Sequence, residues 1–233
     1  MTISHFMNQS YSQDVLERYI MGIKERRDRE KVQRQNDILD AAEKVFFEKG
    51  YNAATMDDVA EEAELSKGTL YLYFKNREEL YFGLTHRALL NLRDRFQKVL
   101  DGDGTGLEKV TKIGRAFHAY SQEEPDYYKT IAQFEMAQLG ATSEGQEVEQ
   151  KCHQAGKGVM EQVAAAIIQG IEDGSIRKDV HPLKTAFLLQ GLSNGVIQLM
   201  AREGKHVDAF EDFEMDDLMD EFIQMMIRAL EPN

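Results

Sequence analysis

The spacing of apolar residues is the strongest pattern in this chain. Along most of its length they recur three and four positions apart, which is the period of an amphipathic α-helix. No segment shows the sustained alternation of apolar and polar residues that is typical of a β-strand. The pattern therefore predicts an all-α protein. The predicted helices cover residues 11–35, 38–49, 55–63, 66–75, 77–100, 107–122, 125–139, 143–172, 184–200 and 216–230.

Residues 55–75 hold two very short predicted helices joined by a tight turn. Thr55 is a typical N-cap, and Asp58 three positions later completes a capping box with it. Ser66 is the corresponding cap of the second helix. Helices this short are stable only when they pack against other parts of a protein. The residues predicted to face inward are Met56, Val59, Ala60, Ala63, Leu65, Leu70 and Phe74.

The outer face of the second short helix is polar and aromatic. Lys67, Thr69, Tyr71 and Tyr73 are free to point outward, and Gly68 lets the backbone approach a ligand closely. Hydroxyl and ammonium groups suit phosphate oxygens. One short helix bracing another is the arrangement with which a helix-turn-helix enters the DNA major groove. The alternative is a common helical hairpin in which the two tyrosines are half-buried packing residues.

The stretch from 36 to 84 resembles the DNA-binding domain of the TetR family of bacterial transcriptional repressors. The matching strings are ILDAAEKVF (38–46), EKGY (48–51), TMDDVA (55–60) and SKGTLYLYFKNREEL (66–80). The resemblance implies phosphate contacts from Thr55, Tyr71, Tyr73 and Lys75. It implies base-edge contacts from Lys67, Gly68 and Thr69. Leu72 departs from the family, because many members have an aromatic residue at its position.

The overall charge does not by itself favour DNA. The chain has 28 basic and 41 acidic residues, a net charge of -13. Salt screens exposed charges over about 8–10 Å, so the local surface decides. In sequence, the outer face of the second short helix carries Lys67 and Lys75 and no carboxylate. A basic stretch also precedes the motif, with Lys24, Arg26, Arg27, Arg29, Lys31 and Arg34.

Residues 1–33 form an N-terminal extension that is predicted to be partly helical or disordered. Its basic part is suited to contact phosphates or the minor groove, as the arms of other helix-turn-helix proteins do. The alternative is a solvated extension without a partner, because Glu25, Asp28 and Glu30 are interleaved with the cations.

Aromatic residues concentrate between residues 117 and 134. At helical spacing such residues most often form a core, but a small-molecule site uses the same types together with a few polar groups. The TetR resemblance implies an inducer pocket in these helices. The candidate ligand-binding residues are Phe117, His118, Tyr120, Tyr127, Tyr128, Phe134 and Glu135. The expected ligand is a small molecule with an apolar or aromatic part.

The last two predicted helices suit an assembly surface. Residues 184–200 are apolar almost all round, and Gly191 and Gly195 permit a close helix crossing. Two copies related by a two-fold axis would form an isologous four-helix interface, which is also the family's usual dimer. The alternative is that both helices pack only within one chain. The candidate interface residues are Leu189, Gly191, Leu192, Gly195, Val196, Leu218, Phe222, Met225 and Met226.

Other kinds of site find no support in the sequence. The single cysteine, Cys152, excludes an internal disulfide and fits a reducing cytoplasm. Cys152 and His153 have no partner cysteine at zinc spacing, and the six histidines form no catalytic pattern. No stretch is long and apolar enough to span a membrane, and the N-terminal residues lack the basic-then-apolar pattern of a signal peptide. We therefore expect a cytoplasmic protein without catalytic activity, cofactor or metal.

These features together predict a DNA-binding domain at 34–80 and a helical ligand-binding and dimerisation domain at 81–233. The expected function is that of a repressor. It binds a palindromic operator in double-stranded DNA as a homodimer and is released by a small-molecule effector, which moves the helix at 77–100. The alternative is a helix-turn-helix adaptor or activator that binds DNA without a small-molecule inducer.

Overall fold

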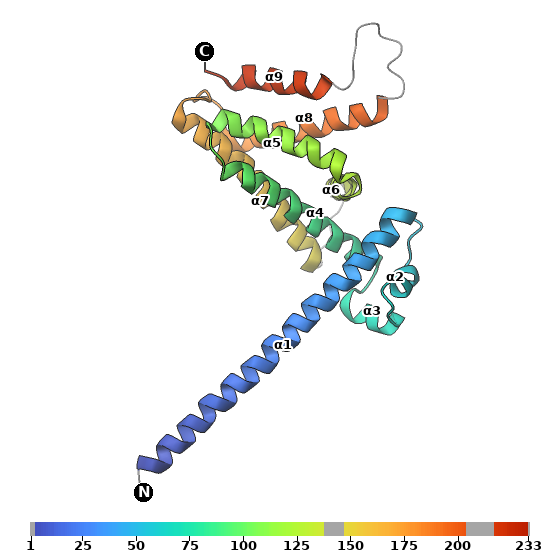
Figure 1. The fold of residues 1–233 in the computed structure, drawn as a ribbon. Coiled ribbons are helices and arrows are strands. Elements are labelled where there is room, and N and C mark those ends of the chain that lie inside the picture. Colours follow the sequence, from blue (N-terminus) through green and yellow to red (C-terminus); the bar gives the residue numbers. More distant parts are fainter. Residues whose placement is uncertain (1–2, 138–146, 204–216, 233) are drawn as a thin grey trace. The chain divides into compact units, whose positions relative to one another are not determined.

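The computed structural model describes residues 3–137, 147–203 and 217–232, with side chains from residue 21 onward except those of 136, 137 and 203. Every long element in these ranges is a helix and none is a strand (Figure 1), which confirms the predicted all-α class. The helices are α1 (Ile3–Lys49), α2 (Met56–Glu62), α3 (Lys67–Tyr73), α4 (Arg77–Leu100), α5 (Gly106–Glu123), α6 (Pro125–Ala137), α7 (Glu147–Asp173), α8 (Pro182–Glu203) and α9 (Leu218–Leu230).

The main departure from the predicted elements is α1. It is one helix of 47 residues, where the sequence predicted two. Neither glycine nor proline lies between Gln35 and Ile38, so nothing in the sequence ends the first segment before the second begins. Parts of three other predicted helices, at 138–139, 143–146 and 216, lie outside the described residues.

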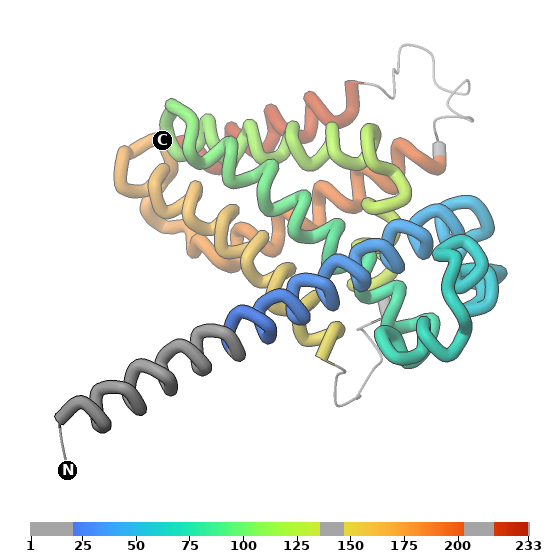
Figure 2. Tube along the Cα trace, turned by 60° about the horizontal axis from the view of Figure 1, so that its bottom comes forward, coloured from blue at the N-terminus to red at the C-terminus, as the bar shows by residue number. Residues whose placement is uncertain are grey.

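The chain divides into two compact units, Met1–Leu80 and Tyr81–Asn233, and the border falls within α4. In the N-terminal unit, α2 packs against both α1 and α3. The two short helices lie together on one side of α1 (Figures 1 and 2). Their shared core consists of Ile38, Ala41, Ala42, Val45, Phe46, Val59, Ala60, Leu70 and Phe74.

The turn between α2 and α3 depends on a left-handed residue. Glu64 has φ 53°, and its N–H donates to the carbonyl of Glu61 at 3.0 Å. The next N–H, that of Leu65, reaches back to the carbonyl of Ala60 at 2.9 Å. This paired bonding satisfies the last carbonyls of α2 and reverses the chain within two residues. The turn therefore sets the angle at which α3 leaves α2.

The C-terminal unit is a bundle of helices centred on α5. This helix packs against α6, α7, α8 and α9, and α8 also contacts both α7 and α9. Tyr120 of α5 is fully buried, and its hydroxyl donates to the carbonyl of Ala88 at 3.1 Å. The α5–α7 contact is close because two glycines, Gly106 and Gly170, meet there. The bundle forms the walls of the cavity described below.

Candidate DNA-binding face and ligand cavity

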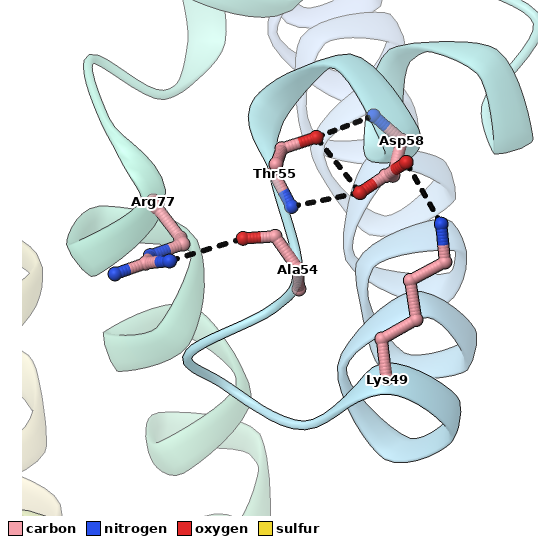
Figure 3. Close-up of polar contacts among 5 residues, drawn as sticks. All are labelled: Lys49, Ala54, Thr55, Asp58 and Arg77. Atoms are coloured by element: carbon pink, nitrogen blue, oxygen red, sulfur yellow. Dashed lines mark hydrogen bonds and ion pairs between the residues drawn. The ribbon is translucent and has the colours of Figure 1, made fainter.

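The helix-turn-helix begins with the predicted capping box (Figure 3). The amide of Asp58 donates to the Thr55 hydroxyl at 3.2 Å, and the amide of Thr55 donates to the Asp58 carboxylate at 2.9 Å. The Lys49 ammonium, at 2.8 Å, and the Thr55 hydroxyl lower the pKa of Asp58 to about 2. Because the Thr55 hydroxyl also donates to Asp58, at 2.7 Å, it is committed to the cap in this structure. Its phosphate contact stays a prediction.

Arg77, at the start of α4, holds the loop that precedes α2. Its guanidinium donates to the carbonyl of Ala54 at 3.1 Å (Figure 3). It also donates to the carbonyl of Asn52 at 3.1 Å and lies 4.4 Å from the centre of the Tyr51 ring. These contacts fix α4 to the start of the helix-turn-helix. This role cannot be predicted from the sequence, because the partners of Arg77 are backbone carbonyls 23 and 25 positions away, which no motif reveals.

Lys67 has a partner that the sequence did not predict. Its ammonium lies 2.6 Å from the carboxylate of Asp57, which belongs to the first turn of α2. This contact raises the pKa of Lys67. The expectation that the Lys67–Lys75 face is free of carboxylates is therefore wrong, because the turn brings α2 beside α3. A DNA phosphate that binds Lys67 must compete with Asp57.

The other α3 candidates are mostly accessible. Tyr71 is 49% exposed, while Thr69 and Tyr73 are half-buried. A Cβ added at Gly68 would meet nothing closer than 3.9 Å. The most exposed side chain of α3 is Leu72, at 81%. An exposed leucine beside polar groups suits apolar contact with a thymine methyl group.

Lys75 follows α3 at the junction with α4. Its ammonium is exposed and lies 3.9 Å from the carboxylate of Glu79. The same carboxylate accepts the Lys75 backbone N–H, and the Asn76 side chain caps the Glu79 amide at 2.8 Å. The junction is thus held by backbone capping, which leaves the Lys75 ammonium at the surface.

A cavity of about 750 Å³ lies in the C-terminal unit, lined by α4 to α9. Its walls are mainly apolar, which is typical of a small-molecule site of this size. Of the candidate ligand-binding residues, Phe117, Phe134 and Glu135 line it, and their contact with a ligand stays a prediction. The remaining candidates do not line this cavity: His118, Tyr120, Tyr127 and Tyr128. Their helices contribute to its walls, but the Tyr120 hydroxyl bonds to the carbonyl of Ala88 and the Tyr128 hydroxyl to the Asn194 side chain.

The main polar group of the cavity is Glu135 of α6. Its carboxylate accepts hydrogen bonds from Gln190 at 2.5 Å and Asn194 at 3.3 Å, both of which also line the cavity from α8. The Tyr128 hydroxyl donates to the Asn194 side chain at 3.2 Å. Burial raises the pKa of Glu135 and raises that of Tyr128 to about 12. A polar cluster thus stands in a mainly apolar cavity, whose α7 wall also carries His153, Lys157 and Glu161.

Glu135 should make stability depend on pH. Its pKa in the folded protein is raised above the usual 4.5, so its contribution is fully present below 4.5 and is lost as the pH rises through the raised value. As the pH rises through this range, we expect the free energy of unfolding to fall less for Glu135→Gln than for the wild type. Urea unfolding at a series of pH values measures this, and parallel stability curves for the two proteins would contradict it.

Helix α8 presents an apolar face at the surface of its own chain. Leu192 is 50% exposed, and Leu188 is 64% exposed. Gly191, Gly195 and Leu199 continue the same face at intervals of three and four residues. Leu188 and Leu199 were not among the interface residues predicted from the sequence. A helix that is apolar almost all round does not reveal which of its sides is covered by the rest of its own chain.

The other candidate interface residues differ in exposure. Met225 of α9 is exposed, and Val196, Leu218, Phe222 and Met226 are half-buried. Leu189 is buried within its own chain and lines the cavity. Its placement at an interface stays a prediction, which its burial within its own chain does not support.

Cys152 is a free cysteine in the packed interior of the C-terminal unit. Its side chain is buried, its thiol donates to the carbonyl of Phe82 at 3.0 Å, and burial raises its pKa to about 12.

Among the described residues there is no cluster of three or more His, Cys, Asp or Glu that would hold a metal ion. None of the described helices is both long and apolar enough to cross a membrane.

A capped helix-turn-helix with an accessible recognition helix, followed by a helical unit around a cavity, defines a class of bacterial DNA-binding regulators. The family model described as "Bacterial regulatory proteins, tetR family" matches residues 38–84. The chain is also 33% identical over 159 residues to the HTH-type transcriptional regulator YhgD of Bacillus subtilis, covering 68% of this chain and 79% of YhgD. The chain belongs to the TetR family, and it is a DNA-binding transcriptional regulator rather than an enzyme.

Two further similarities are to transcriptional regulators of Bacillus subtilis. The fatty acid metabolism regulator protein of Bacillus subtilis is 27% identical over 141 residues, which are 60% of this chain and 70% of that protein. The crystal structure of FadR from Bacillus subtilis in complex with stearoyl-CoA has a TM-score of 0.62 and 19% identity, over 84% of this chain and 98% of that one. At 19% identity, the similarity between the two structures shows a shared fold.

Proposed function

We propose that the protein is a repressor that binds a palindromic operator as a homodimer and leaves it when a small molecule occupies the cavity. The accessible face of α3 is the observation that carries this proposal. Lys67, Gly68 and Tyr71 stand on a helix that is two turns long and held from behind by its own core. Such a helix presents its polar groups to DNA in one fixed orientation. Operator binding would place the protein in the cytoplasm.

The exposed face of α8 supports the dimer. Leu188, Leu192 and Leu199 lie on one side with two glycines between them, so a second copy of the helix can approach closely. An apolar face of this kind on a regulator marks an interaction site. Joined by a two-fold axis, two chains present two α3 helices to successive major grooves of a palindrome.

The effector proposed for the cavity is mainly apolar, with one polar group. The cavity volume and apolar walls suit a long hydrocarbon part. Gln190 and Asn194 already bond to Glu135, so a ligand group that reaches this cluster must offer hydrogen bonds in their place. The stearoyl-CoA bound by the similar B. subtilis regulator makes a long-chain acyl thioester the first compound to test.

Release follows from coupling between the two ligands. An effector that favours a different position of α4 shifts the start of that helix, and Arg77 carries the shift to the loop before α2. The spacing of the two α3 helices then no longer fits the operator. Because coupling is reciprocal, operator DNA must weaken effector binding by the same factor.

We expect Lys67→Ala to weaken binding to operator DNA by about fivefold or more, because a good contact to a base edge is worth about 1–3 kcal/mol. The duplex is obtained by selection from random DNA with the wild-type protein, and binding is measured by fluorescence anisotropy. Lys44→Ala is the matched control. It removes the same charge and likewise separates an ion pair, Lys44–Glu62 at 2.9 Å, but lies on α1 rather than α3.

The same measurement with stearoyl-CoA, and with free coenzyme A as the compound lacking the chain, tests the effector. Failure of the wild type to select any duplex would refute operator binding. A selected duplex that binds equally with and without every acyl thioester would instead favour the alternative, a DNA-binding adaptor or activator without an inducer of this class.

A further inference from the structure

The part of α1 that precedes the N-terminal core is strongly basic. Residues 24–34 hold six cations and three carboxylates, in a chain whose net charge is -13. Almost every side chain from residue 21 to 37 is exposed, and Ile38 is the first buried one among the α1 side chains described, which start at residue 21. This segment therefore adds nothing to the hydrophobic core of the N-terminal unit. Its charges face water along a helix that continues directly into the helix-turn-helix.

Four of the cations lie on one face of the helix. Lys24, Arg27, Lys31 and Arg34 follow one another at intervals of three, four and three residues. At about 100° per residue they fall within an arc of about 80°, and they span about 15 Å along the axis. We call these four residues the cationic stripe. The three carboxylates of the segment lie outside this arc.

The cationic stripe lies in line with the buried face of α1. Continuing at the same angle per residue, Ile38, Ala42 and Val45 point in the same direction as the stripe. These residues are buried in the N-terminal unit, where α1 packs against α2. The stripe therefore faces the side of α1 on which α2 and α3 lie (Figures 1 and 2). This is also the side to which a duplex bound by α3 would come.

The stripe is weakly paired. Among the residues whose side chains are described, Lys24, Arg27 and Lys31 have no carboxylate partner, and Arg34 is 3.9 Å from Asp37. On another face, Arg26 pairs with Glu30 at 3.5 Å. The charges of the stripe are thus available to an external anion.

We propose that the cationic stripe binds the phosphates of the same duplex that α3 reads, beyond the base pairs of the recognition helix. A duplex carries one charge per about 1.7 Å, so 15 Å of DNA offers about nine phosphates to four cations. The large exposed apolar side chains of the segment, Met21 and Val32, lie outside the arc of the stripe, so its face offers a membrane surface no apolar group to insert. Phosphate contacts carry no base information, so the stripe adds affinity and fixes register without changing the sequence that is preferred.

The proposal rests on operator binding by α3, and its test uses pairs of variants with equal charge. Arg27→Gln with Lys31→Gln removes two cations of the stripe. Arg26→Gln with Arg29→Gln removes two from the remaining circumference and is the matched control. All four side chains are exposed, so each double variant should keep the helix content of the wild type in circular dichroism.

The measured quantity is the slope of log Kobs against log salt for the selected duplex, in the full-length protein. The stripe variant is expected to reduce its magnitude by about 0.9 for each phosphate that the protein no longer neutralises, and the control variant to leave it unchanged. The preferred sequence, determined again by selection, should be the same for both variants.

The outcomes separate the two proposals. If the wild type binds no duplex, operator binding and the stripe both fail. If the wild type binds and both variants keep its slope, the stripe alone is refuted. Equal reductions of the slope in the two variants would also refute it, because they would show a general effect of net charge rather than binding by one face.

Discussion

Gly106→Ala is expected to destabilise the C-terminal unit by about 3 kcal/mol or more, at the upper end for an added methyl group in a packed interior. Gly106 is the first residue of α5 and is buried against α7. A Cβ there would overlap the backbone nitrogen and Cα of Gly170 and lie 2.5 Å from the carbonyl oxygen of Ala166. Backbone atoms of a helix do not move aside, so α5 and α7 would have to separate.

That separation would also break the polar contacts around Gly106. Its N–H donates to the Asp173 carboxylate at 2.7 Å, and the N–H of Leu107 donates to the Ser175 hydroxyl at 3.1 Å. These bonds satisfy two of the first amides of α5, which have no partner within the helix. Separation of α5 from α7 would leave them without a partner, which adds to the cost of the overlap.

Urea unfolding measures the effect, with Gly114→Ala as the control. Gly114 is on the same helix, and a Cβ there would meet nothing within 4 Å. Its replacement should stabilise the protein by up to about 1 kcal/mol, because alanine has the higher helix propensity. A Gly106→Ala protein with wild-type stability would show that α5 and α7 do not approach as closely as described.

Local signals explain how well the sequence predicted the helix-turn-helix. Thr55 and Asp58 are three residues apart, and so are Asn76 and Glu79, so each cap is visible in a short string. The pairing of Lys67 with Asp57 was not visible, because the angle at the Glu64 turn decides which groups of α2 meet α3. A motif specifies the elements and their caps, but contacts between elements depend on geometry that the motif does not encode.

The cavity shows the same limit at longer range. Phe117 and Tyr120 are one turn apart on α5, yet Phe117 lines the cavity and Tyr120 is buried with its hydroxyl on the carbonyl of Ala88. Their spacing predicts a shared general direction and cannot decide which of them borders a space. That depends on α4, which is distant in sequence. The sequence therefore located the region of the cavity but only part of its lining.

Leu192→Glu is expected to convert the proposed dimer into monomers and to abolish operator binding. Leu192 is half exposed in the single chain, so the substitution leaves the fold of one chain intact. At an isologous interface the same patch is used by both chains, so the change occurs twice and buries two carboxylates. Burying an unpaired charge costs several kcal/mol, and each 1.4 kcal/mol weakens association tenfold.

Two measurements on the same samples test this. Sedimentation gives the mass in solution, and anisotropy gives the affinity for the selected duplex. Ile168→Glu is the matched control, because Ile168 is similarly exposed, at 45%, but belongs to α7 rather than to α8. It should keep the mass of the wild type and bind DNA as the wild type does.

The combination of mass and affinity decides what the α8 face does. A monomer that no longer binds the operator shows that two copies of α3 must be held together for recognition, since each short helix alone makes too few contacts. A Leu192→Glu protein that stays dimeric would place the interface elsewhere. A monomer that still binds the duplex with wild-type affinity would mean that one α3 helix suffices, which contradicts recognition of a palindrome by a dimer.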